Sequence, residues 1–247
     1  MDVLGIDIGG SYIKGAIVDV QTGKLNSEPL QVETPQPASP AAIIEVTADL
    51  VKSFPWHGAI GCGFPAVIQA GVAKTASNID DLWIGLNVKE EMERATGCPC
   101  SVLNDADAAG LAEMQFGEGQ GRNGTVLVLT LGTGVGSALF SQGELVPNLE
   151  LGCLPINGIP ADHYAAAAVR RRENLSWQSW TQRLNLFLNH VERLLSPELI
   201  IIGGGISSEY KIFFPQLKTE ADLLPAHFLN QAGIVGAACF AAEKSHV

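Results

Sequence analysis

The chain has 247 residues, of which 47% are hydrophobic and 17% charged, and its formal net charge is -11. This composition is typical of a globular protein with a sizeable core, and the negative charge argues against general nucleic-acid binding. No apolar run approaches the ~18 residues of a membrane span, so no membrane association is expected. Five cysteines without a disulfide-framework spacing, and a first strand that leaves no room for a signal peptide, predict a cytoplasmic protein.

The first predicted elements are two strands joined by a glycine turn. The strand-like runs 3–8 and 12–19 flank Gly9-Gly10-Ser11, and three prolines within 31–40 predict an extended link. Further along the chain, the pattern predicts helices at 41–54, 88–96, 105–116 and 234–244, two helices within 161–195, strands at 59–65, 100–104 and 198–206, and turns over 68–85.

A weak internal repeat suggests the architecture. IDIGGSYIKGAIV (6–18) can be laid over LTLGTGVGSALF (129–140), with Gly9 on Gly132 and Ala16 on Leu139. Each unit is followed by a turn and a short strand, QTGKL in one half and SQGEL in the other. The repeat predicts two similar α/β lobes, with a small ligand in a cleft between them.

The two glycine turns are candidate phosphate sites. Glycine lets the backbone approach a ligand closely, and consecutive N–H groups can bind an anion without a helix. The spacing is neither that of a P-loop nor that of a Rossmann loop, both of which lead into a helix. One such turn alone would be an ordinary hairpin, but two in matching positions favour phosphate binding.

Two charged residues lie beside the first turn. Asp7 is near the end of a hydrophobic strand, where burying a carboxylate costs free energy unless it is paired or bound to metal. Asp7 could therefore hold Mg²⁺ through water, or its side-chain oxygen could cap the turn. Lys14 could neutralise phosphate or lie on an exposed strand face.

The stretch LNDADAAGLAE (103–113) places polar side chains between a strand and a helix. Asn104 or Asp105 could cap the helix, with Asp107 adding a favourable charge at its N-terminus. The same position suits a general base that accepts a proton from a sugar hydroxyl during phosphoryl transfer.

At this point the sequence resembles a known family. DIGGSYIKGA, LNDADAAGLAE, LTLGTGVGSAL, PNLELG and IIIGGGIS, in this order, are similar to motifs of the ROK sugar kinases, and TPQPASP, TASNIDDLWIGLN and QAGIVGAA resemble the polyphosphate glucokinase branch. The resemblance implies an actin/hexokinase-like (ribonuclease H-like) α/β fold of two lobes, a small lobe at 1–103 plus 234–247 and a large lobe at 104–233. Since the sequence shows no helix-turn-helix domain like that of the family's DNA-binding members, a repressor function is not expected.

The resemblance also implies roles. Asp105 corresponds to the catalytic base, Asn104 and Glu150 to sugar ligands, and Asn78 to a further sugar contact. The implied phosphate and nucleotide ligands are Gly9, Gly10, Ser11 and Lys14 in the first turn, Thr130, Gly132, Thr133 and Gly134 in the second, and Gly204 and Gly205 beside the adenosine of ATP. The implied enzyme is a Mg²⁺-dependent transferase of carbohydrate metabolism and glycolysis, a homodimer that phosphorylates the 6-hydroxyl of glucose or a related hexose from polyphosphate, ATP or both.

The sequence departs from the family pattern at Cys153. The family has Glu-x-Gly-His, whereas this chain has Glu150-Leu-Gly-Cys153, and a thiol is a weak hydrogen-bonding group. His163 could replace the lost contact or be a surface histidine. An alternative function is therefore a non-catalytic sugar- or phosphate-binding protein of the same fold. Like the polyphosphate branch, the chain lacks the family's zinc-binding cysteine cluster, and Cys98 and Cys100 are interpreted as structural thiols.

Overall fold

The computed structural model describes residues 1–245 and folds into two compact units. The first unit comprises Met1–Ala112 and the segment that begins at Gln231, and the second comprises Glu113–Asn230. The chain passes from the first unit to the second inside helix α3 (Asp105–Phe116). The predicted lobe boundary at 103/104 lies before this helix.

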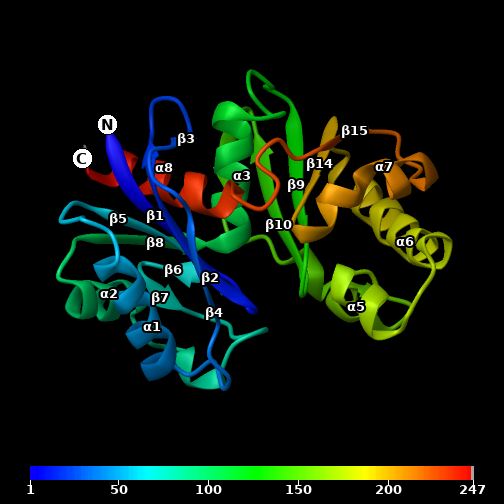
Figure 1. The fold of residues 1–247 in the computed structure, drawn as a ribbon. Coiled ribbons are helices and arrows are strands. Elements are labelled where there is room, and N and C mark those ends of the chain that lie inside the picture. Colours follow the sequence, from blue (N-terminus) through cyan, green and yellow to red (C-terminus); the bar gives the residue numbers. More distant parts are fainter. Residues whose placement is uncertain (246–247) are drawn as a thin grey trace. The chain divides into compact units, whose positions relative to one another are not determined.

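The sheet of the first unit places three strand ends side by side. Its strands are β1 (Asp2–Ile8), β2 (Tyr12–Asp19), β3 (Lys24–Leu25), β4 (Leu30–Glu33), β5 (Ile60–Phe64) and β8 (Cys100–Asn104). The order is β3-β2-β1-β5-β8, with β4 paired to β2 (Figure 1). Because β5 and β8 run parallel to β1, the carboxyl ends of all three strands share one edge of the sheet.

Helices cover this sheet closely. A Cβ on Gly5 or Gly61 would overlap a backbone carbonyl of α8 (Ala232–Ser245), so the α8 backbone lies directly on β1 and β5. Helices α1 (Pro40–Lys52) and α2 (Val88–Thr96) contribute to the main apolar core of the unit, around the packed rings of Phe64 and Trp83. Between β5 and α2 lie the two-residue strands β6 (Ile68–Gln69) and β7 (Val72–Ala73) and a 3-10 helix at Asp81–Trp83.

The second unit repeats this strand order. Its strands β9 (Thr125–Leu131), β10 (Val135–Ser141), β11 (Glu144–Val146), β14 (Leu199–Gly203) and β15 (Asp222–Pro225) form a sheet in the order β11-β10-β9-β14-β15 (Figure 1). A separate hairpin consists of β12 (Pro155–Ile156) and β13 (Ile159–Pro160). In both units, an antiparallel hairpin and its short third strand extend a parallel set.

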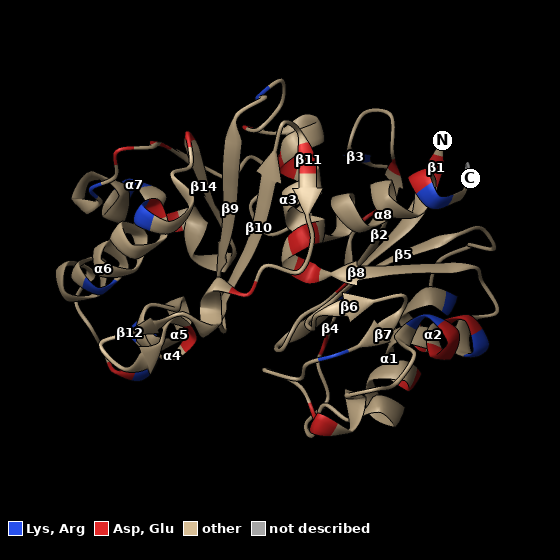
Figure 2. Ribbon diagram, turned by 180° about the vertical axis from the view of Figure 1, so that it is seen from behind, with Lys and Arg blue, Asp and Glu red and all other residues tan. Residues whose placement is uncertain are grey.

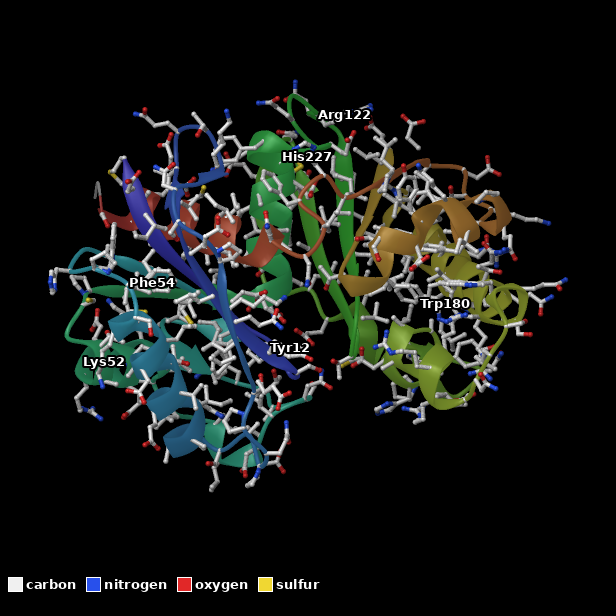
Figure 3. The ribbon with its side chains drawn as sticks, in the orientation of Figure 1. Tyr12, Lys52, Phe54, Arg122, Trp180 and His227 are labelled. Atoms are coloured by element: carbon white, nitrogen blue, oxygen red, sulfur yellow. The ribbon has the colours of Figure 1, made fainter. Side chains whose placement is uncertain are left out.

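The helices of the second unit are α4 (Ala161–Tyr164), α5 (Ala167–Arg172), α6 (Trp177–Leu195) and α7 (Tyr210–Phe213). The buried Trp180 of α6 donates an indole hydrogen bond to the Ala165 carbonyl at 2.9 Å and packs edge-on against Phe213 (Figure 3). These contacts connect α6 to α7 and to the segment between α4 and α5.

The strand-turn-strand repeat is confirmed, with a correction to its register. With Gly9 laid on Gly132, Gly5 lies on Val128. Gly5 pairs with Ala16 and Val128 pairs with Ala138, so Ala16 is equivalent to Ala138 and not to Leu139. The second hairpin is therefore one residue shorter at its turn. The structure also has three helices within 161–195 where two were predicted, ends the 198–206 strand at Gly203, and begins the 31–40 link as strand β4.

Candidate active site

Asn104 and Asp105 lie at the carboxyl end of β8, where α3 begins. The Asn104 side-chain oxygen accepts from the Ala106 amide at 2.9 Å and from the Asp107 amide at 3.1 Å, so Asn104 caps the helix. Its side-chain NH₂ donates to the Ala66 carbonyl at 3.1 Å, which fixes the buried amide group. Asp105 is half-buried, and one of its carboxylate oxygens accepts from the Ala106 amide at 2.9 Å.

Asp7 lies near this position, two residues before the first glycine turn. It pairs in register with Gly63 of β5, and a Cβ on Gly63 would lie 3.5 Å from the Cα of Asp105. Asp7 and Asp105 are thus both neighbours of Gly63. The first turn of α3 is acidic, as the red segments of this helix in Figure 2 show.

Burial and a nearby cation act in opposite directions on Asp7. Burial raises the pKa of the Asp7 carboxyl above its ordinary value, and Lys14, whose Nζ lies 3.7 Å from Oδ2, offsets part of that rise. Gly233, near the N-terminus of α8, faces the same carboxylate, since a Cβ there would lie 2.7 Å from its Cγ. The structure therefore pairs Lys14 with Asp7, an arrangement in which a second cation could further stabilise the carboxylate.

The second unit brings two glycine loops together. Thr130 pairs in register with Gly203, so the β9–β10 turn (132–134) and the glycines that follow β14 lie at one sheet edge. Gly204 has φ 81°, and a Cβ there would lie 2.6 Å from the Leu131 carbonyl oxygen. Only glycine permits both this backbone conformation and this approach.

Two acidic residues, Glu150 and Asp162, lie close enough to Cys153 in the second unit to act on its thiol. Burial, and secondarily the negative charge of Asp162, raise the pKa of Glu150. Burial, then Glu150 and Asp162, raise the pKa of the exposed Cys153 thiol, which favours its neutral form. Asp162 also accepts from the Val135 amide at 2.6 Å and thereby contacts the strand that follows the second glycine turn.

Sequence reasoning missed Asp162 and chose its neighbour. His163 is exposed, whereas Asp162 is the residue whose charge acts on both Glu150 and Cys153. The only available signal was the position of Asp162 in the segment LPINGIPADHYA, which departs from the family pattern. Asn78 lies in an exposed bend of the first unit.

Three consecutive arginines, Arg170–Arg172, end helix α5, but they do not form a uniform basic surface. The Arg170 guanidinium carbon lies 3.7 Å from the ring centroid of Trp177, so this side chain packs against the aromatic cluster. Arg172 contacts Glu173 at 3.4 Å, and Arg171 is exposed. Figure 2 likewise shows basic residues scattered over several elements.

Among residues 1–245, no group of three or more His, Cys, Asp or Glu side chains is placed to hold a metal ion. Cys98 and Cys100 are both buried, and burial, together with the nearby Glu93 carboxylate, raises the pKa of Cys100 to about 12. In the same described part of the chain, no helix is long and apolar enough to cross a membrane.

Known proteins resemble this chain over most of its length. A family model described as ROK family matches residues 3–147. A polyphosphate glucokinase of Mycobacterium tuberculosis is 42% identical over 235 residues, which are 95% of this chain and 89% of that protein. An inorganic polyphosphate/ATP-glucomannokinase from Arthrobacter sp. strain KM has a TM-score of 0.96 and 46% identity, with 98% of this chain and 99% of that chain covered.

A more distant structure resembles the chain in fold alone. A ROK family glucokinase from Streptomyces griseus, solved with glucose and AMPPNP, has a TM-score of 0.85 at 24% identity and covers 98% of this chain and 100% of its own. The predicted fold class, two actin/hexokinase-like α/β lobes, is confirmed by these matches.

Proposed function

Because the chain belongs to the ROK family, we propose that it is a sugar kinase that transfers a phosphoryl group from polyphosphate or ATP to the 6-hydroxyl of glucose. Its relatives named polyphosphate glucokinase and polyphosphate/ATP-glucomannokinase match nearly the whole chain and support this activity. They also disfavour the alternative of a non-catalytic sugar-binding protein.

One structural observation carries the mechanism. Asn104 caps α3, so Asp105 lies in the first turn of a rigid helix, at the sheet edge that also holds the first glycine turn. We assign Asp105 the role of general base, which accepts the proton of the sugar 6-hydroxyl as the oxygen attacks the terminal phosphorus of the donor. The bond from that phosphorus to the bridging oxygen breaks, and the shortened donor leaves.

Sugar binding is assigned to three polar side chains. The Asn104 amide uses one of its two N–H bonds on Ala66 and can donate the other to a hydroxyl. Glu150 accepts from a second hydroxyl when ionised, and Asn78 is a further proposed contact. Glucose is the proposed substrate, and the name of the Arthrobacter relative makes mannose the first epimer to test.

Donor binding is assigned to the backbone of the two glycine turns. The first turn contributes Gly9, Gly10 and Ser11, with Lys14, and the second Thr130 and Gly132–Gly134, while Gly204 and Gly205 lie against adenosine when ATP is bound. Mg²⁺ supplies charge neutralisation on the donor phosphates. Asp7 fits a water-mediated contact to that ion, because its largely buried charge is only partly compensated by Lys14.

A coupled assay tests the proposal. Purified protein is incubated with Mg²⁺, glucose or mannose, and either polyphosphate or ATP, and hexose 6-phosphate is measured through NADP reduction. We expect glucose-dependent product with at least one donor. Absence of product with every pair, from a folded protein, would contradict the kinase assignment. We also propose that the protein is a cytoplasmic homodimer. Gel filtration tests the oligomeric state, and cell fractionation tests the location.

A further inference from the structure

Thr34 holds the first glycine turn through two hydrogen bonds. It directly follows β4, is 6% exposed, and lies across from the turn because Glu33 pairs with Tyr12. The Thr34 hydroxyl donates to the Gly9 carbonyl at 2.6 Å, and its backbone amide donates to the Ser11 carbonyl at 3.0 Å. Two carbonyls of the turn are therefore drawn toward Thr34. Figure 3 labels Tyr12 at the start of β2, next to this turn.

The direction of a carbonyl fixes the direction of the next amide. In a planar trans peptide, the C=O of one residue and the N–H of the following residue point in opposite directions. Since Thr34 holds the Gly9 oxygen, the Gly10 N–H points away from Thr34. The Gly9 N–H donates to the Tyr12 carbonyl at 2.9 Å, and within residues 1–245 none of the hydrogen bonds seen at this turn uses the Gly10 N–H.

Without an anchor this peptide would be poorly fixed. It joins two glycines, which have no Cβ to restrict rotation, so both orientations of the peptide plane are accessible at low cost. A rotated peptide would present a carbonyl oxygen where a phosphate is to bind. Threonine suits the anchoring role because its β-branch restricts χ1 and keeps the hydroxyl in place.

The glycine turn of the second unit is held in the same way, but by a hydrogen bond from a backbone amide and not from a side-chain hydroxyl. The Gly132 carbonyl, equivalent to that of Gly9, accepts from the Ala168 backbone amide of α5 at 2.9 Å, and Gly132 N–H donates to the Gly134 carbonyl at 3.0 Å. The following N–H, on Thr133, is thereby directed away from α5. In each unit, one bond from outside the hairpin orients the peptide that follows its first glycine.

We infer that Thr34 is a positioning residue for the phosphoryl donor, which orients the Gly10 N–H toward a donor phosphate. This rests on the proposed function, because it assigns the first turn to the donor. The Thr34 hydrogen bond to Gly9 positions a group that contacts phosphate and not adenosine, so the binding of polyphosphate and of ATP should depend on Thr34 alike. The binding of glucose should not depend on it.

The test compares Thr34→Val with a matched control. Valine keeps the shape and removes the hydroxyl. Thr47→Val is the control, because Thr47 of α1 is also buried in the first unit and, among the described residues, its hydroxyl has no hydrogen-bond partner. We expect Thr34→Val to raise KM for both donors about tenfold, the scale of one hydrogen bond to a charged group, with glucose KM unchanged. Thr34→Ser should restore donor KM, and Thr47→Val should leave it unchanged.

Donor binding without turnover separates this inference from the proposed function. Calorimetry with inorganic tripolyphosphate and Mg²⁺ should show the same loss for Thr34→Val even if wild-type protein phosphorylates no sugar. If Thr34→Val fails to fold, Thr34→Cys is measured instead, because a thiol is similar in size to the hydroxyl but donates a weaker hydrogen bond. Donor KM and tripolyphosphate affinity within twofold of wild type in the folded variant would overturn the inference, as would an equal rise in glucose KM or equal losses for Thr34→Val and Thr34→Ser.

Discussion

Asn104 caps the helix in which Asp105 is the first residue. The Asn104 side-chain oxygen accepts from two amides of the first turn, and the Asp105 carboxylate accepts from the amide of its neighbour Ala106. Capping and the proposed chemistry are thus assigned to adjacent but different side chains. A substitution at one can be expected to leave the task of the other in place.

The first prediction concerns Asp105→Asn. The variant should lower kcat about 10²-fold or more, the usual scale of general base catalysis, with a small change in glucose KM. Its melting temperature should stay near that of the native protein because the Asn104 cap remains. Asn104→Ala is the complementary variant and should lose about 1 kcal/mol of stability. Near-normal turnover of Asp105→Asn would reduce Asp105 to a structural residue.

The second prediction separates the members of the arginine run. Arg171→Glu should weaken long-chain polyphosphate more than ATP, and the difference should shrink at high salt because exposed charges are screened. Arg170→Glu is expected instead to lower the melting temperature, since it removes the guanidinium packed on Trp177. Equal effects of Arg171→Glu on both donors would exclude a polyphosphate contact at this helix.

The third prediction concerns Cys153→His, which restores the family residue beside two carboxylates. An imidazole can donate a hydrogen bond to sugar, so glucose KM should fall several-fold, as expected for one bond of roughly 0.5–1.5 kcal/mol. Cys153→Ala should change KM only slightly, because the thiol contributes little. A native glucose KM already as low as that of a typical glucokinase would show that another residue, with Asp162 the first candidate, supplies the contact.

The same variant has a pH signature. Burial and Asp162 raise the pKa of Glu150, so its ionised, hydrogen-bond-accepting form is lost at higher pH than for an ordinary glutamate when the solution is acidified. A protonated imidazole at 153 favours the ionised carboxylate. The acid limb of kcat/KM for glucose should therefore move to lower pH in Cys153→His. An unmoved limb would mean that Glu150 does not control glucose binding.

The fourth prediction concerns Glu113, a buried carboxylate in α3 that accepts from the amides of Glu118, His227 and Phe228. Glu113→Gln places an NH₂ group against at least one of these N–H donors. Each amide left unpaired costs roughly 1–3 kcal/mol, so the urea midpoint should fall clearly. Glu118→Gln, a change in an exposed side chain, is the matched control and should have little effect. Equal stability of the two variants would contradict the assigned role.

Much of the fold could be predicted because local patterns and tertiary structure agree there. The glycine hairpins, the strand that ends at Asn104 and helix α3 all follow from hydrophobic periodicity and turn residues. Strand β15 (Asp222–Pro225) was not predicted, because only Leu223 and Leu224 give it an apolar signal and its pairing partner is β14. The split of α4 from α5 was missed because the run Ala165–Ala168 has no residue that would mark a break.

The parts of the candidate site that lie within one short motif could be predicted from the sequence. The parts that depend on contacts between residues far apart in the sequence could not. Asp105 and the glycine turns lie within short recognisable stretches. Thr34 acts on a turn that precedes it by 25 positions, and Asp162 acts on Val135 across 27, so neither relationship is visible without the strand pairing. The one-residue slip in the repeat arose because the first turn is longer, a difference that hydrophobic spacing does not reveal.

The placement of α8 has a consequence for how the chain is made. This helix packs on β1 and β5 of the first unit, yet it follows the whole second unit in the sequence. During synthesis, the apolar face of the first sheet must wait for residues 232–245, while 113–230 form a continuous segment that can fold earlier. A chain truncated after residue 230 would therefore contain the whole second unit but an unfinished first one. That nascent state is where a chaperone would be needed.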